Sequence, residues 1–160
     1  MQLAATWMPV ANFEGRRFAY VGTGGADVIG KVYADPGTAG TRTMVPTTGN
    51  RLPYAPEAML TATFGLRHRS GAELRVEAVM VSAQFTDPVN TRVLVPDGQQ
   101  GPIAASTLWN LTVNAPLFGT GARGWVVVRN LADQTFVVDR SRGLLPGMPR
   151  LLQAGMSRSF

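Results

Sequence analysis

The sequence contains no cysteine and only one histidine, His68, and these shortages exclude several kinds of site. Without cysteine the chain can form neither a disulfide nor a thiolate metal site. For the same reason, cysteine usage does not indicate whether the protein belongs to an oxidising or a reducing compartment. One histidine cannot supply the roughly three ligands of an ordinary zinc site. The sequence also has no Walker-type phosphate loop and no nucleophile elbow. We therefore predict that the chain is not an enzyme and binds no cofactor or metal.

The sequence also lacks any apolar run close to the roughly 20 residues that a membrane-spanning helix requires. Its first residues do not combine a basic segment with an apolar one, so we expect no signal peptide. With 160 residues, 45% of them hydrophobic, the chain is long enough to bury a core of its own. We therefore predict a single domain over residues 1–160.

Lysine is nearly absent: Lys31 is the one lysine among 15 basic residues, which outnumber the 10 acidic ones. Arginine has a planar guanidinium that pairs with phosphate through two hydrogen bonds and stacks on bases, which lysine cannot do. This bias favours contact with RNA or DNA. A genome that favours arginine codons would produce the same bias, so both explanations stay open.

The first part of the sequence is typical of strands and turns. Ala4–Val10 and Arg16–Val21 are predicted to form an N-terminal hairpin, followed by a third strand at Val28–Ala34. Residues 1–34 would therefore hold the N-terminal hairpin and strand. The proline- and glycine-rich connection that follows leaves room for one short strand, Thr43–Val45.

The clearest strand pattern lies in the centre, over residues 58–116. Apolar and polar residues alternate in Ala58–Arg67, in Leu74–Val81 and in Leu108–Asn114. Such alternation is typical of an antiparallel sheet with one covered face and one wet face. We therefore predict a central antiparallel sheet. The long loop between the second and third of these strands could enclose a short ribbon at Thr91–Val95.

The spacing of apolar residues changes after Pro116. Trp125, Val128 and Leu131 recur at every third position, which is typical of an amphipathic helix. The β-branched residues of 125–128 and 135–138 favour strands instead, so both structures stay open from these residues alone.

A second short helix is predicted from Met148, Leu151 and Leu152, with Pro149 in its first turn. Residues 120–160 would then form two C-terminal helices.

Two segments resemble the coat protein of the small single-stranded RNA phages, the levivirus group. The first is the hairpin of 59–67 with 74–79; the second is 109–120, followed by the helical pattern and the aromatic C-terminus Phe160. The resemblance implies an α+β fold with an N-terminal β-hairpin, a five-stranded antiparallel sheet and two C-terminal helices. It also implies an intertwined dimer with a ten-stranded sheet.

The resemblance implies a capsid protein that dimerises, assembles into an icosahedral shell and packages genomic RNA on its helix-free face. Its partners would be a second copy of itself, single-stranded RNA and a maturation protein, with no membrane. It would be found in the virion, and in the host cytoplasm during assembly. The residues placed on the RNA by position are Thr61, Thr63, Gly65, Arg67, Arg75, Glu77, Asn110 and Thr112. The residues expected in dimer and helix packing are Trp125, Val128, Leu131, Leu151 and Leu152.

Two other functions compete with this one. A β-sandwich decoration or connector protein of a tailed phage would bind other proteins and no RNA, and strands over 120–138 would favour it. A small sugar- or nucleic-acid-binding β domain is the other competitor, although the sequence shows no aromatic platform for such a ligand.

Overall fold

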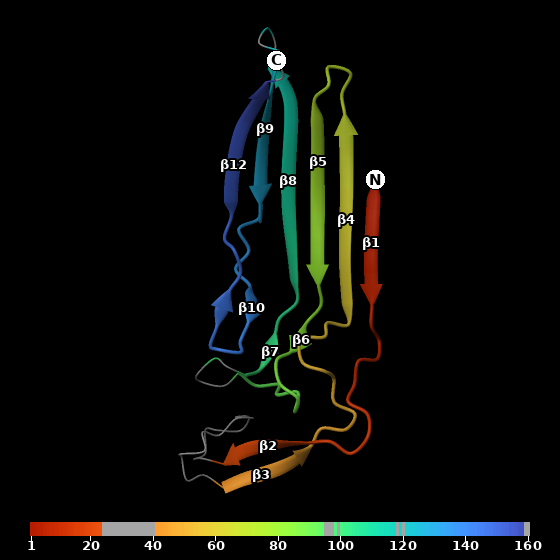
Figure 1. Cartoon of the computed structure of the whole chain (residues 1–160), viewed down its shortest axis with the longest axis vertical. Helices are drawn as coiled ribbons and strands as arrows, with labels where there is room; N and C mark the ends of the chain where they lie inside the picture. Colours follow the sequence, from red (N-terminus) through yellow and green to blue (C-terminus); the bar gives the residue numbers. More distant parts are fainter. Residues whose placement is uncertain (24–40, 95–97, 99, 118, 120, 159–160) are drawn as a thin grey trace.

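In the computed structural model, six long strands form one antiparallel sheet in the order β1-β4-β5-β8-β9-β12 (Figure 1). The structure describes residues 1–23, 41–94, 98, 100–117, 119 and 121–158. The strands of the sheet are β1 (Gln2–Trp7), β4 (Ala58–Arg67), β5 (Glu73–Val81), β8 (Ser106–Leu117), β9 (Ala122–Arg129) and β12 (Leu151–Arg158).

Three small hairpins lie beyond one end of this sheet (Figure 1). They pair β2 (Phe18–Thr23) with β3 (Thr41–Pro46), β6 (Gln84–Phe85) with β7 (Pro102–Ile103), and β10 (Val137–Asp139) with β11 (Leu145–Pro146).

The two ends of the sheet are built differently. At one end, which we call the turn end, β4 is joined to β5 by residues 68–72, and β8 to β9 by residues 118–121. At the opposite end, the loop end, the connections are long, namely 8–57, 82–105 and 130–150. Figure 1 shows the short turns at the top of the sheet and the long connections below it.

The predicted α+β fold is wrong, because the described residues contain strands and no helix. The two C-terminal helices of 120–160 are replaced by β9 and β12, which pair with each other over their full length. Two causes act together. The valines at 126–128 are β-branched and favour a strand. In addition, β9 finds a partner in β8, where Val126 lies opposite Val113. A helical spacing of apolar residues cannot compete with these pairs.

The predicted N-terminal hairpin of Ala4–Val10 with Arg16–Val21 is also wrong. β1 pairs with β4, and β2 pairs with β3 rather than with the strand before it. The alternation of apolar residues along β1 explains why it pairs with β4: Leu3 lies opposite Ala62 and Ala5 opposite Leu60, all on the same face of the sheet. The predicted strand Val28–Ala34 lies outside the described residues. No ribbon forms over residues 91–94, and the last residue of that predicted ribbon is not described.

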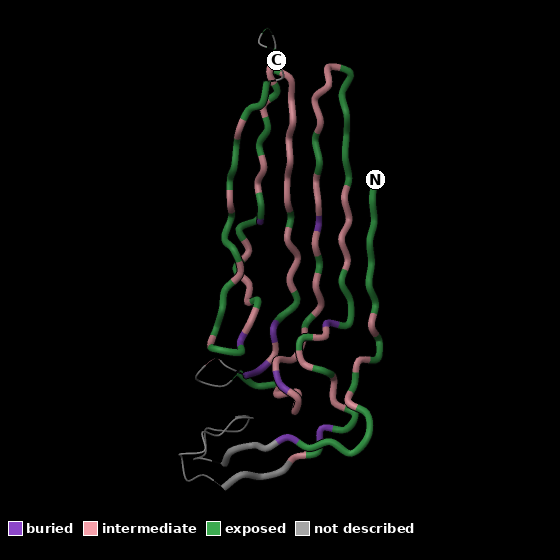
Figure 2. Tube along the Cα trace, viewed as in Figure 1, coloured by how far each residue is buried: buried purple, intermediate pink, exposed green. Residues whose placement is uncertain are grey.

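The three central strands are confirmed by β4, β5 and β8, which alternate as the sequence indicates. Few residues are buried anywhere in this fold (Figure 2). Among the described residues, the buried hydrophobic ones are Ala19, Ala78 and Ile103, and no large side chain is fully buried. Most of the buried residues lie in the connections of the loop end, and the described strands of the sheet form a single layer (Figure 2).

Candidate functional site

The eight residues placed on RNA by the coat-protein resemblance share one face of the sheet. Arg75 lies opposite Gly65 on one side and Thr112 on the other, and Glu77 lies between Thr63 and Asn110. Directly paired residues of an antiparallel sheet point to the same side. We call this side the polar face. RNA binding by these residues stays a prediction.

Hydrogen bonds within the chain already occupy several of these polar groups. The Nδ2 of Asn110 donates to Glu77 Oε1 at 2.8 Å, and its Oδ1 accepts from the Asn130 backbone at 3.1 Å. Asn110 therefore links three segments, namely β5, β8 and the end of β9. At the turn end, Arg67 forms an ion pair with Glu73, its partner across β4 and β5.

The residues predicted to pack dimer helices are distributed over both faces of strands. Trp125 and Leu151 lie on the polar face, while Val128 and Leu152 lie on the other. Leu131 lies in the connection after β9, where its backbone N–H donates to the Trp109 carbonyl at 2.7 Å. The helices in which these residues were expected are wrong, because four of the residues lie in strands and Leu131 lies in a connection. Dimer packing by these residues stays a prediction.

The other side of the sheet, which we call the apolar face, carries almost no polar group. One row crosses five strands and consists of Phe64, Val76, Leu111, Val128 and Leu152. The next row is Leu66, Leu74, Val113, Val126 and Ala154. On the six strands, Thr107 and Arg158 are the polar residues of this face.

The apolar face is open to solvent. The side chains of Leu3, Leu66, Leu152 and Met156 are 63%, 56%, 68% and 77% exposed, and Trp109 in the middle of the sheet is 44% exposed. No second sheet and no helix lies against this face within the described ranges. The predicted alternation could have revealed this surface, because the same apolar side continues through 122–129 and 151–158. The spacing after Pro116 fits a helix as well as a strand, and the predicted helices hide this continuation of the apolar face.

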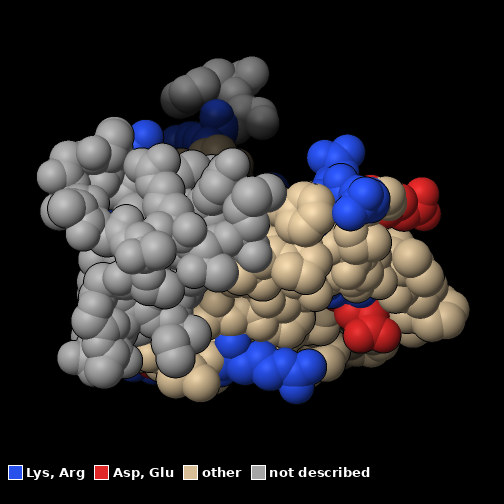
Figure 3. Space-filling model, turned by 90° about the horizontal axis from the view of Figure 1, so that it is seen from below, with Lys and Arg blue, Asp and Glu red and all other residues tan. Residues whose placement is uncertain are grey.

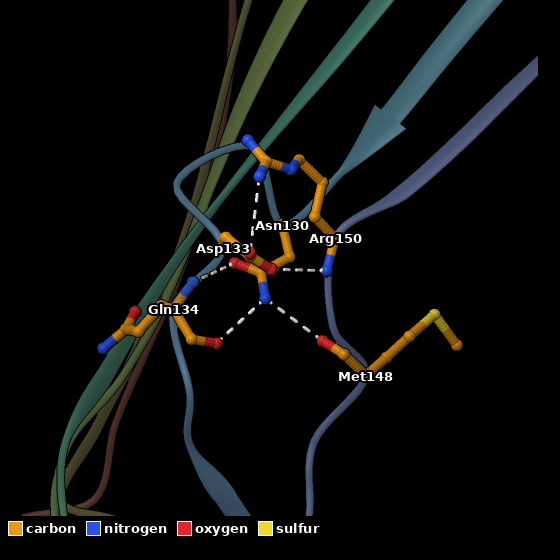
Figure 4. Close-up of polar contacts among 5 residues, drawn as sticks. All are labelled: Asn130, Asp133, Gln134, Met148 and Arg150. Carbon is orange, nitrogen blue, oxygen red and sulfur yellow. Dashed lines mark hydrogen bonds and ion pairs between the residues drawn. The ribbon is translucent and has the colours of Figure 1, made fainter.

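A turn at the loop end fixes the path from β9 to β12 (Figure 4). Asn130 Nδ2 donates to the carbonyls of Gln134 at 2.9 Å and Met148 at 3.1 Å, while its Oδ1 accepts from the Gln134 N–H at 2.9 Å. Asp133 accepts from the Arg150 backbone at 3.0 Å and forms an ion pair with its guanidinium at 3.3 Å. This turn therefore holds the start of β12 in register with β9.

Polar groups also join the long connections of the loop end to one another. Arg51 donates to the carbonyls of Ala55 at 2.7 Å and Met8 at 2.6 Å, and its backbone exchanges two hydrogen bonds with Asn90. Asp87, only 3% exposed, accepts from the N–H groups of Val89 and Thr91. Basic and acidic side chains both lie on the described surface of this end (Figure 3).

Tyr54 joins this network to the hairpin of β10 and β11. Its hydroxyl donates to Asp139 Oδ1 at 2.6 Å, and the Ser141 hydroxyl donates to Oδ2 at 2.5 Å. These two hydroxyls, that of Ser141 first, hold the pKa of Asp139 well below its ordinary value. Burial and the hydrogen bond to Asp139 raise the pKa of Tyr54 above its ordinary value. The pair is therefore a carboxylate and a neutral phenol at neutral pH.

The described residues contain no cluster of acidic and histidine side chains that could hold a metal ion. They also contain no helix of the length and apolarity that crossing a membrane requires.

No protein-family model and no curated protein matches the chain. Among solved structures, the chain is similar to the ferric citrate transporter FecA in its unliganded form, with a TM-score of 0.60 and 24% sequence identity. The match covers 72% of this chain and 19% of the FecA chain. At this identity the likeness shows a common fold for the sheet.

Proposed function

We propose that the sheet is part of the wall of an outer-membrane transporter, with its apolar face against lipid. The open apolar face carries this proposal. Soluble proteins rarely leave contiguous apolar patches larger than a few hundred Å² in water. Moving one large apolar side chain out of water contributes about 1.5–3 kcal/mol, and here such side chains lie on every strand of the sheet.

The lengths of the three central strands agree with this role, whereas β1, β9 and β12 are shorter, with 6, 8 and 8 residues. Strands that cross a bilayer need about 9–11 residues when tilted. β4, β5 and β8 have 10, 9 and 12 residues. Along β4, the apolar positions from Ala58 to Leu66 extend over about 26 Å at roughly 3.3 Å per residue. With the usual tilt of about 35–45°, this stretch would cover about 18–21 Å of the roughly 25 Å apolar band of outer-membrane proteins.

The difference between the two ends of the sheet supports the same proposal and gives it a direction. Outer-membrane sheets have short turns on the periplasmic side and longer loops on the outer side. The turn end would then face the periplasm, and the joined connections of the loop end would face outward. The polar face would point away from lipid, toward the interior that such a sheet encloses.

The likeness to FecA supports a transporter specifically. Because it covers 19% of the FecA chain, the sheet would be one section of a longer wall. The sheet's two edges, β1 and β12, would pair with further strands, since an unpaired edge in lipid leaves backbone groups without partners.

Packaging of RNA as a phage coat protein stays a separate prediction. The interlocking of dimers in that family uses two C-terminal helices, and β9 and β12 take their place here. The strands β9 and β10 meet the condition that favours a β-sandwich accessory protein. Such a protein would also need a second sheet over the apolar face, and the described residues supply none. Both functions are therefore outcomes that the following experiment can detect.

Tryptophan fluorescence provides the test, because the two central tryptophans lie on opposite faces. Trp109 is on the apolar face and Trp125 on the polar face. One variant keeps Trp109 and replaces Trp7 and Trp125 by phenylalanine; the matched control keeps Trp125 and replaces Trp7 and Trp109. Both are refolded into vesicles of brominated phosphatidylcholine, whose bromine atoms quench tryptophans that they contact.

We expect strong quenching of Trp109 and little quenching of Trp125. Equal and weak quenching of both would overturn the proposal. So would recovery of the chain from the aqueous phase, either as shells with nuclease-protected RNA or as soluble dimers with Trp109 shielded.

A further inference from the structure

We propose that an arginine-lined cleft at the turn end binds a phosphate group. The cleft has a volume of about 670 Å³. Its polar lining consists of Arg67, His68, Arg69, Glu73, Asn114 and Arg123. This inference does not depend on whether the sheet lies in a membrane.

The cationic groups of the cleft come from strands that are not neighbours. Arg67 ends β4 and Arg123 lies near the start of β9, with β5 and β8 between them. The guanidinium of Arg123 reaches the β4–β5 turn and donates to the Gly71 carbonyl at 2.9 Å. This hydrogen bond holds one guanidinium beside the cleft and leaves its other N–H groups for a ligand.

The charges of the cleft do not cancel. Glu73 is the one acid of the lining, and it forms an ion pair with Arg67. Glu73 therefore neutralises Arg67, and the positive charges of Arg69 and Arg123 remain. An anion between them would gain charge-assisted hydrogen bonds, which are about twice as strong as neutral ones.

The uncharged groups of the lining also suit an oxyanion. The Nδ1 of His68 accepts from the Ser70 backbone N–H at 3.2 Å and lies 2.8 Å from the Ser70 hydroxyl. In the neutral ring the proton then lies on Nε2, which becomes a donor. Asn114 adds a side-chain amide. A phosphate group offers several acceptor oxygens around one centre, and arginine forks bind it through two hydrogen bonds.

Titration of the full chain in detergent micelles with inorganic phosphate, at constant ionic strength set by chloride, tests the proposal. We expect saturable binding that weakens about tenfold in Arg69→Gln and in Arg123→Gln. Arg92→Gln, an exposed arginine at the loop end, is the matched control and should bind as the parent does. Far-UV circular dichroism checks that each variant keeps its sheet.

Glycerol 3-phosphate is the second probe and identifies the source of the group. Tighter binding than inorganic phosphate would indicate a phosphate carried on a small molecule, and equal binding would indicate free phosphate. Absence of saturable binding would overturn the proposal. Equal weakening in Arg92→Gln would overturn it as well. Because Arg69 is an exposed turn residue, its variant remains informative even if Arg123→Gln loosens the turn.

Discussion

The indole ring of Trp125 lies across Gly155, its direct partner between β9 and β12. A Cβ atom added to Gly155 would stand 2.5 Å from Cζ2 of this ring and 2.7 Å from Cε2. Carbon atoms in contact are normally 3.5–4.0 Å apart. Glycine is therefore required at position 155 for the ring to lie flat on the polar face, where it covers backbone that a side chain would otherwise cover.

Gly155→Val should displace the ring and weaken the pairing of β9 with β12. We expect a loss of about 1–3 kcal/mol of unfolding free energy, which is typical of overpacked positions. Near-UV circular dichroism should lose the signal of Trp125. Ala154→Val, one residue earlier and on the opposite face, is the control and should change little. An unchanged tryptophan signal in Gly155→Val would show that the ring does not depend on this glycine.

Asn110→Ala should destabilise the sheet more than its small size suggests. The change removes the acceptor of the Asn130 N–H and the donor to Glu77. Leaving such groups unsatisfied costs about 1–3 kcal/mol. Denaturant unfolding measures this loss, with Thr112→Ala on the same face as control. If the two variants lose equal stability, the bridge through Asn110 contributes nothing.

The turn at Asn130 combines a strained backbone with side-chain hydrogen bonds. Two substitutions separate the contribution of the strain to stability from that of the hydrogen bonds. Its φ angle is +50°, in the left-handed region. Asn130→Gly relieves the strain and removes the hydrogen bonds, whereas Asn130→Ala removes the bonds and keeps the strain. We expect Ala to destabilise the fold by about 1 kcal/mol more than Gly. Thermal unfolding of the two variants measures the difference, and equal losses would contradict a strained turn.

Tyr54 should lose its phenolic proton above the ordinary pH of about 10, because burial and Asp139 raise its pKa. A raised pKa in the folded state stabilises the fold below the ordinary pKa, and this contribution disappears as the pH rises through the folded value. Absorbance at 295 nm follows the titration, and Tyr54→Phe identifies which transition belongs to it. Asp139→Asn should move the midpoint back toward the ordinary value. If the titration midpoint of Tyr54 is the same in Asp139→Asn as in the parent, Tyr54 is not hydrogen-bonded to Asp139.

Arginine at two neighbouring positions of β9 should have opposite consequences if the apolar face meets lipid. Val126 lies on the apolar face, between Val113 and Ala154, and Val127 on the polar face, between Thr112 and Gln153. Arginine in mid-bilayer costs about 2–4 kcal/mol. We expect Val126→Arg to reduce the fraction of chain that refolds into vesicles and Val127→Arg to leave it nearly unchanged. Equal fractions would count against a lipid-facing surface.

The central strands could be predicted from the sequence because each alternates in isolation. In β4, a single window holds Leu60, Ala62, Phe64 and Leu66 on one side and threonines on the other. The partner of β1 could not be predicted in this way. Its pairing with β4 joins residues more than 50 positions apart, and a local hairpin with 16–21 matched the same pattern.

β9 could not be predicted for a different reason. Trp125, Val128 and Leu131 fit a helical spacing, while Ala122, Gly124, Val126 and Val128 fit a strand, and only pairing with β8 decides between them. The cleft at the turn end could not be predicted either. Arg67 and Arg123 are 56 positions apart in the sequence and meet only because the strand order brings their ends together.

The two edges of the sheet have a consequence for how this protein melts. Among the described strands, β1 and β12 each pair on one side only, and the apolar side chains gain no burial until something apolar covers them. If the sheet lies in a membrane as proposed, its free energy of unfolding depends on the sheet itself, on the strands that would complete its edges and on the medium at its apolar face. Heating would not reveal a melting temperature intrinsic to these 160 residues. The measured midpoint would change with detergent, lipid thickness and the supply of neighbouring strands.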